Sequence, residues 1–284
     1  MRKLILATRG SRLALVQAGL VRARLEELGI TVEQKIVKTR GDRDRISPLK
    51  EIGGKGLFVK EIEQQLKNGQ ADLAVHSGKD LPYTLLEGMR IAATPRAADP
   101  RDCLVFCKNR KLPEAPVIGT GSPRRVAACR RFYPDAHFKD IRGNIDTRLR
   151  KLVEGEYDAV ILAKAGLDRL GIDREGLELR VFETDEFVPA ACQGILAVEC
   201  RNDDEEVVSL LRQISDPLTQ QRFDLERRVF CELQADCSMA VGVHAGILGE
   251  TVRLSVLYQD KRFLGNANIT DAEKLIEEMK KKLI

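Results

Sequence analysis

The residues best suited to chemistry are arginines at three predicted helix starts, each of which directly follows a predicted strand. They are Arg9, Arg124, Arg125, Arg142 and Arg148. A helix N-terminus carries a partial positive charge, so a cation there is unfavourable unless an anion lies nearby. With an anion bound, backbone N–H groups and guanidinium forks converge on the same oxygens. For any single arginine a solvated surface turn is the simpler interpretation, but three occurrences predict a ligand with several negative charges.

A lysine and an aspartate, Lys79 and Asp80, follow another short apolar run in the segment Ser-Gly-Lys-Asp-Leu-Pro. An aspartate shortly before a proline is common in turns, so a turn is one interpretation. The other is a carboxylate in a basic cleft, where neighbouring cations keep it ionised. Such a group could stabilise a developing cation or accept hydrogen bonds from ring N–H groups. The spacing alone leaves both interpretations open.

Carboxylates fit the predicted ligand better than nucleotides do. The glycine-rich loop at residues 53–56 lacks the spacing of a phosphate-binding loop, and no Gly-x-Gly-x-x-Gly follows a strand. The chain has 47 basic and 43 acidic residues, a net charge of +4. Aromatic residues make up only 5% of the chain and tryptophan is absent. This composition argues against nucleic-acid binding, which remains a weaker alternative.

The elements that position these residues alternate between strands and helices over the first two thirds of the 284-residue chain. This rhythm predicts α/β lobes with largely parallel, doubly wound sheets. In the first lobe we expect strands at 3–8, 31–38, 71–76 and 90–94, and helices at 11–28 and 57–67. In the second we expect strands at 103–107, 117–119, 137–139 and 158–163, and helices at 123–132, 145–153 and 164–170.

The remaining segments predict a return to the first lobe and then a third domain. A strand at 195–199 and a helix after residue 203 would complete the first lobe. A helix at 218–233, strands at 239–247, 252–258 and 262–269, and a helix at 271–283 predict a small α+β domain with an antiparallel three-stranded sheet. The expected domains are therefore 1–94 with 190–214, 95–189, and 215–284. The two lobes would enclose a cleft, as in periplasmic binding proteins.

Cysteine and histidine spacing predicts neither disulfides nor a metal site. The seven cysteines are dispersed and odd in number, and the three histidines lie far apart. No stretch approaches the roughly 20 apolar residues of a membrane span. The apolar run at the N-terminus is too short for a signal peptide. We therefore expect a cytosolic protein without a metal.

Several long segments of this chain resemble the hydroxymethylbilane synthase (porphobilinogen deaminase) family. They include Ala-Thr-Arg-Gly-Ser, Gly-Gly-Lys-Gly-Leu-Phe-Val-Lys-Glu, Ala-Val-His-Ser-Gly-Lys-Asp-Leu-Pro, Arg-Gly-Asn-Ile-Asp-Thr-Arg-Leu-Arg-Lys-Leu and Tyr-Asp-Ala-Val-Ile-Leu-Ala. The resemblance implies a transferase of tetrapyrrole (haem) synthesis. Such an enzyme joins four porphobilinogen molecules head to tail, with loss of ammonia, into linear hydroxymethylbilane.

The resemblance also implies a covalent dipyrromethane cofactor, held by a thioether to Cys237, with Cys231 as the competing cysteine. It implies a monomer that acts on porphobilinogen, with no nucleic-acid or membrane partner. The implied catalytic residues are Asp80 and Lys79. The implied cofactor-binding residues are Cys237, Ser11, Lys79, Asp80, Thr120, Ser122, Arg124, Arg125, Arg142 and Gly143. The implied substrate-binding residues are Arg9, Lys55, Arg142, Arg148, Arg169 and Gln193.

The chain departs from the family pattern at a few positions, and one alternative function stays open. The departures are Gly78, Gly121, Pro123, Cys192, Asp236 and Ala240. An aspartate beside Cys237 would disfavour its thiolate, which bears on cofactor loading more than on the fold. The alternative is a non-catalytic two-lobed module that binds a carboxylate ligand. The contexts of Asp80 and Cys237 favour the enzyme.

Overall fold

The computed structural model describes residues 3–39, 59–82, 84–173, 175–235 and 239–284. The chain divides into two compact units. Unit 1 comprises Met1–Ala98 and Ile195–Asp224, and unit 2 comprises Asp99–Gly194 and Leu225–Ile284. The boundary near residue 224 falls inside one helix, α8 (Pro217–Glu232).

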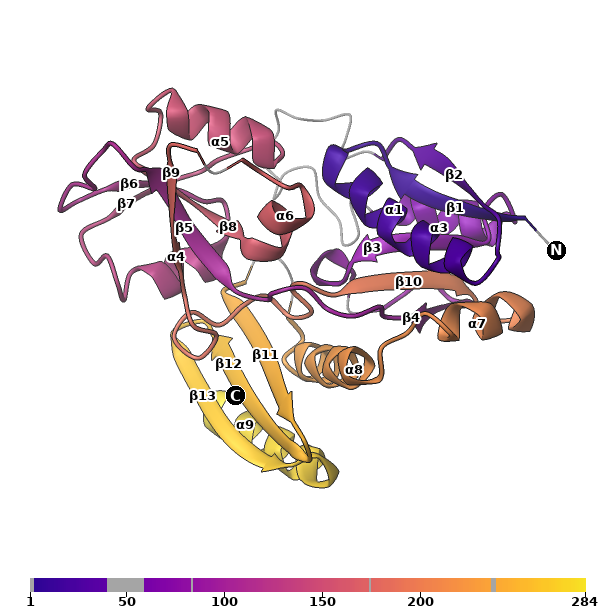
Figure 1. The fold of residues 1–284 in the computed structure, drawn as a ribbon. Coiled ribbons are helices and arrows are strands. Elements are labelled where there is room, and N and C mark those ends of the chain that lie inside the picture. Colours follow the sequence, from indigo (N-terminus) through magenta and orange to yellow (C-terminus); the bar gives the residue numbers. More distant parts are fainter. Residues whose placement is uncertain (1–2, 40–58, 83, 174, 236–238) are drawn as a thin grey trace. The chain divides into compact units, whose positions relative to one another are not determined.

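Unit 1 is built around a mixed five-stranded sheet with the order β2-β1-β3-β10-β4. Its elements are β1 (Leu4–Arg9), α1 (Arg12–Glu27), β2 (Val32–Val37), α3 (Lys60–Lys67), β3 (Leu73–Ser77), the 3-10 turn η1 (Gly78–Asp80), β4 (Met89–Ala93), β10 (Leu196–Arg201) and α7 (Glu205–Arg212). Strand β1 pairs in parallel with β2 and β3, whereas β10 runs antiparallel to β3 and β4. Figure 1 shows β10 lying between its two neighbours.

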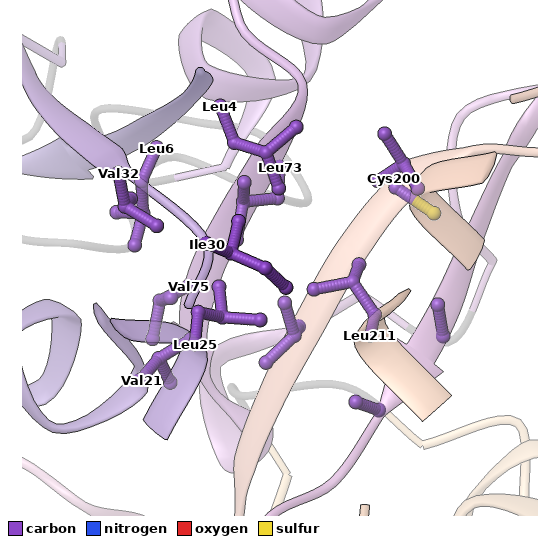
Figure 2. Close-up of a cluster of buried hydrophobic side chains, with 14 of the residues drawn as sticks. Leu4, Leu6, Val21, Leu25, Ile30, Val32, Leu73, Val75, Cys200 and Leu211 are labelled. Carbon is purple, nitrogen blue, oxygen red and sulfur yellow. The ribbon is translucent and has the colours of Figure 1, made fainter. Parts of the chain in front are cut away.

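One core cluster of unit 1 lies between this sheet and the helices α1 and α7, and a second includes α3. Apolar residues recur every three or four positions along α1, and Ala18, Val21 and Leu25 are buried. They pack with strand residues such as Leu6 and Val75 in the cluster of Figure 2. Ser11 caps α1 by accepting a hydrogen bond from the backbone N–H of Ala14. This cap fixes the turn that joins β1 to α1.

Unit 2 holds a second mixed sheet with the order β7-β6-β8-β5-β9. Its elements are β5 (Asp102–Cys107), β6 (Val117–Gly119), α4 (Pro123–Cys129), β7 (His137–Lys139), α5 (Ile145–Val153), β8 (Ala159–Ala163), α6 (Lys164–Arg169) and β9 (Leu177–Val181). Strand β6 is parallel to β7 and β8, and β5 is antiparallel to β8 and β9. Strand β9 was not predicted, although its sequence Leu-Glu-Leu-Arg-Val alternates as an edge strand should.

The two sheets therefore share one topology. In each, the fourth strand of the order runs against the other four. These strands are β10 in unit 1 and β5 in unit 2. Each is preceded along the chain by a segment of the other unit, not by a helical crossover from its own sheet. The parallel direction that βαβ crossovers impose does not apply to it. The sheets are mixed for this reason.

The C-terminal part of unit 2 is a three-stranded antiparallel sheet packed on helices. Its elements are β11 (Val241–Leu248), β12 (Thr251–Tyr258), β13 (Lys261–Asn268), the 3-10 turn η2 (Ile269–Asp271) and α9 (Ala272–Leu283). Its core includes Val243, Leu254 and Met279. The predicted α/β class with an added antiparallel sheet is confirmed. Among the described residues, no helix is both long enough and apolar enough to cross a bilayer.

Candidate functional site

Unit 1 carries a pocket at the carboxyl ends of β1 and β3. Its lining includes Arg9, Ser11, Gln17, His76 and Asp80. Three of these, Arg9, Ser11 and Asp80, are residues that the sequence analysis assigned to the site. Ligands of open α/β sheets bind at the carboxyl ends of strands, and the pocket lies at such ends. The structure thus brings a cation, a hydroxyl and a carboxylate together.

Asp80 is exposed and lies at the end of η1, directly after β3. The backbone N–H of Gly78 donates to the carbonyl of Ile195 over 2.9 Å, and this bond joins the start of the turn to the segment that leads into β10. Among the described residues, no side chain or amide donates to the Asp80 carboxylate. Its oxygens are thus available to a ligand. The neighbouring Lys79 is half-buried.

A buried polar layer supports this turn from behind. The side-chain amide of Gln17 donates to the hydroxyl of Ser77 over 2.9 Å. A ring nitrogen of His76 lies 2.9 Å from Glu199 Oε2, and both side chains are almost fully buried. Burial and the nearby Glu199 carboxylate raise the pKa of Glu63. The side-chain contacts of Gln17 and His76 hold the end of β3, and therefore η1, in place.

In unit 2, two arginines of α4 converge on one buried aspartate, Asp102. Arg124 Nη1 donates to Asp102 Oδ2 over 2.7 Å. Arg125 donates to Oδ1 through Nε at 3.1 Å and Nη2 at 2.8 Å. All three side chains are less than a tenth exposed. Burial lowers the pKa of Arg124, and the Asp102 carboxylate opposes that shift.

These contacts qualify the prediction for Arg124 and Arg125. Their position at a helix start predicts an anion between them. The Asp102 carboxylate of the chain itself supplies one negative charge there. Both side chains also donate to backbone carbonyls. Arg124 Nη1 donates to the carbonyl of Val188 and Arg125 Nη1 to that of Ile161. Counted over the residues that the structure describes, one carboxylate between two guanidinium groups leaves the buried cluster with an excess of one positive charge.

A second pair of arginines, Arg142 and Arg148, lies at the start of α5. Arg142 Nε donates to Asp140 Oδ2 over 3.1 Å, and Arg148 Nε donates to the carbonyl of Gly143 over 2.9 Å. Burial, with the like charges of Arg125 and Arg142, lowers the pKa of Arg148 to about 10. The group stays cationic at neutral pH. The four arginines of the two helix starts thus belong to one electrostatic cluster.

The turn before α5 requires a glycine. Gly143 has φ of 104°, and a Cβ there would lie 2.7 Å from the Thr147 side chain. Asn144 caps the helix by accepting from the Thr147 N–H over 2.9 Å. The backbone around the predicted cofactor residue Gly143 is therefore fixed independently of any ligand.

The remaining predicted residues of unit 2 hold its own loops. Thr120 Oγ1 accepts from the Ser122 N–H over 3.2 Å, and Ser122 caps α4. Arg169 Nη2 donates to the carbonyl of Gly194 over 2.7 Å, and burial lowers the pKa of Arg169 to about 10. Gln193 is buried and donates to the carbonyl of Pro100 over 2.7 Å.

The predicted residues thus fall into three groups. Unit 1 holds Arg9, Ser11, Lys79 and Asp80. Unit 2 holds Thr120, Ser122, Arg124, Arg125, Arg142, Gly143, Arg148, Arg169 and Gln193. Lys55 and Cys237 lie outside the described residues. Sequence reasoning missed Asp102 as the partner of two arginines, and the only signal was an acidic residue in an otherwise apolar strand.

A family model described as "Porphobilinogen deaminase, dipyromethane cofactor binding domain" matches residues 4–209. The porphobilinogen deaminase of Roseiflexus sp. (strain RS-1) is 46% identical over 256 residues, which cover 88% of this chain and 84% of that relative. The porphobilinogen deaminase of Streptococcus sanguinis (strain SK36) is 42% identical over 264 residues, 90% of this chain and 86% of the relative. Among solved structures, the Bordetella pertussis BvgS periplasmic VFT2 domain is 15% identical, with a TM-score of 0.45, over 81% of this chain and 92% of that chain.

Proposed function

We propose residue roles for a chain that belongs to the porphobilinogen deaminase family. Its activity is that of the family, a transferase reaction of tetrapyrrole biosynthesis that yields hydroxymethylbilane, with a dipyrromethane cofactor. The family match shows the reaction. The roles proposed for individual residues are supported by the contacts of their side chains.

The donor set in unit 2 fits a cofactor that carries carboxylates. Arg124 and Arg125 share the carboxylate of Asp102, and Arg148 adds a half-buried cation whose charge acts together with theirs. A bound carboxylate would offset this excess positive charge through charge-assisted hydrogen bonds. Arg142, Arg148 and the N–H groups near Gly143 are the residues we assign to the cofactor and substrate acids. When bound, the dipyrromethane group supplies the pyrrole carbon to which the first substrate unit is joined.

Asp80 is assigned the catalytic role in unit 1. The reaction breaks the C–N bond of the aminomethyl group, releases ammonia and leaves positive charge on the pyrrole ring of the substrate. The new C–C bond then forms with loss of a ring proton. A carboxylate carried by this turn would lower the energy of the cation and could accept a proton from the ring. Arg9 and Ser11, which line the same pocket, would hold a substrate carboxylate.

Cys237 is assigned the thioether link to the cofactor, and Lys55 and Lys79 are assigned contacts with acidic groups. We further assign the catalytic carboxylate to residues 1–94 with 190–214, the arginine-rich wall to 95–189 and the attachment cysteine to 215–284. A monomeric protein in the cytosol stays a prediction. All of these assignments rest on the family resemblance and on residue positions in the sequence.

The observation that carries the residue roles is the excess positive charge around Asp102 together with an exposed Asp80 that has no donor among the described residues. Intact mass spectrometry of the purified chain tests the cofactor assignment. We expect a covalent mass excess that disappears in Cys237→Ala and persists in Cys231→Ala. A mass equal to the bare chain, with no turnover of porphobilinogen after reconstitution, would favour a non-catalytic carboxylate-binding module. Loss of the excess in Cys231→Ala alone would move the attachment to Cys231.

A further inference from the structure

The carboxylate of Asp140 occupies a defined place among the arginines of unit 2. Strands β6 and β7 are parallel neighbours, so the residues that follow them meet at one edge of the sheet. Gly121 follows β6, and Asp140 follows β7. The backbone N–H of Thr120 donates to the carbonyl of Lys139 over 3.0 Å, which holds the two loops together. The hydroxyl of Tyr157 donates to the Asp140 carbonyl over 2.8 Å and fixes its backbone.

Because Gly121 has no side chain, the Asp140 carboxylate has room to lie against the loop at residue 121. A Cβ built on Gly121 would lie 2.3 Å from Asp140 Oδ1, a separation that real atoms do not tolerate. Gly121 has no positive φ that would by itself require glycine. Any larger residue at 121 would therefore displace the Asp140 carboxylate, and glycine lets it lie against the loop.

In that position the carboxylate neutralises a residue that we assign to the ligand. Asp140 Oδ2 lies 3.1 Å from Arg142 Nε, and the Asp140 charge also acts on Arg148. The Asp140 side chain is 56% exposed and that of Arg142 is 31% exposed. Exposed ion pairs stabilise a fold little, so exchanging this one for a ligand carboxylate costs little free energy.

We infer that Asp140, admitted by Gly121, is an internal counter-ion for Arg142 that the carboxylates of porphobilinogen or of the growing chain displace when they bind. It weakens the binding of each acid and eases release of an acid-rich chain. This inference rests on the proposed role of Arg142 and adds to it a residue that sets affinity rather than chemistry.

Two variants should produce the same effect by different routes. Asp140→Ala removes the carboxylate, and Gly121→Ala pushes it away from Arg142. We expect each to lower KM for porphobilinogen by roughly two- to fivefold, the equivalent of one exposed ion pair, with kcat within twofold of the wild type. On an Asp140→Ala background, Gly121→Ala should have no further effect. Asp135→Asn, which removes the same charge from an exposed turn of unit 2, is the matched control.

A second measurement is independent of turnover. In the Cys237→Ala background, on which we expect no chain to grow, the Kd for porphobilinogen measured by isothermal titration calorimetry should fall by the same factor. An unchanged Kd in both variants, or one raised by Asp140→Ala, would overturn the inference. If the wild type binds porphobilinogen without consuming it, the proposed function fails while the Kd values still test the role of Asp140. If porphobilinogen does not bind at all, both proposals fall.

Discussion

The two α/β sheets have the same strand order and directions, yet their strand ends carry different chemistry. In unit 1 the turn after β3 presents Asp80, a carboxylate to which no described residue donates, above a buried layer of His76 and Glu199. In unit 2 the corresponding edge is cationic, and its buried carboxylate, Asp102, binds two guanidinium groups. The shared topology thus places functional side chains at the same edge of each sheet, while the residue types determine which chemistry each edge supports.

The comparison also separates two kinds of carboxylate. Asp102 is buried and compensated by two cations, whereas Glu63 and Glu199 are buried near His76 and have no arginine partner among the residues that the structure describes. The first should be essential to the stability of unit 2. Glu63, whose pKa is raised, should cost unit 1 some stability when ionised. Substitutions of single carboxylates distinguish these cases.

The largest expected effect is on stability in unit 2. Asp102→Asn removes the charge that two buried guanidinium groups share, and we expect it to lower the free energy of unfolding by about 3–5 kcal/mol. Urea denaturation followed by circular dichroism measures this. Asp99→Asn breaks a more exposed pair with Arg101 and should cost at most about 1 kcal/mol. Equal losses in the two variants would contradict the assigned importance of Asp102.

The next effect is on activity in unit 1. Asp80→Asn keeps the shape of an exposed side chain and removes its charge, so the free energy of unfolding should change by less than about 0.5 kcal/mol. Turnover of porphobilinogen should fall by roughly 10²- to 10³-fold, the usual effect of losing one preorganised electrostatic group. Asp203→Asn removes the same charge from an exposed turn of unit 1 and should keep full activity. Near-normal turnover in Asp80→Asn would remove Asp80 from the catalytic role.

A smaller effect should follow from loss of a single cation in unit 2. Arg148→Ala should raise KM for porphobilinogen by roughly ten- to a hundredfold, because it removes one charge-assisted hydrogen bond of about 1.5–3 kcal/mol. Arg150→Ala, on the same helix but paired with Glu154 at the surface, is the control and should leave KM unchanged. Steady-state kinetics of both variants checks the difference. A rise in KM of the same size in Arg150→Ala would indicate a general effect of charge.

The smallest effect is a gain of stability in unit 1. Because the pKa of Glu63 is raised in the folded protein, ionising this group disfavours folding as pH rises above its unfolded pKa. Glu63→Gln should therefore be more stable than the wild type at pH 7, and the difference should shrink toward pH 4. Thermal unfolding across this pH range measures it. Glu87→Gln, a substitution at an exposed position, should show no such trend. A gain in stability of Glu63→Gln that grows at low pH would contradict a raised pKa of Glu63.

The sequence predicted most elements because their signals are local. Apolar periodicity located α1 and α5, and polar residues suited to capping, Ser11 and Ser122, precede α1 and α4 in the sequence. The rule that an arginine at a helix start needs an anion was also sound. It could not reveal that Asp102 supplies one, because that contact joins residues 22 apart on different elements. The strand β9 was missed because outward Glu178 and Arg180 make it resemble a loop.

The position of β10 has a consequence for the order in which a newly made chain can fold. Strand β4 lies at the edge of its sheet, and its partner in the described sheet is β10, more than a hundred residues later. Every strand of the other sheet has been synthesised once residue 181 has left the ribosome. The sheet of unit 1 therefore has its edge strand β4 unpaired until residue 201 has been made, so the five-stranded sheet that is begun first is completed second.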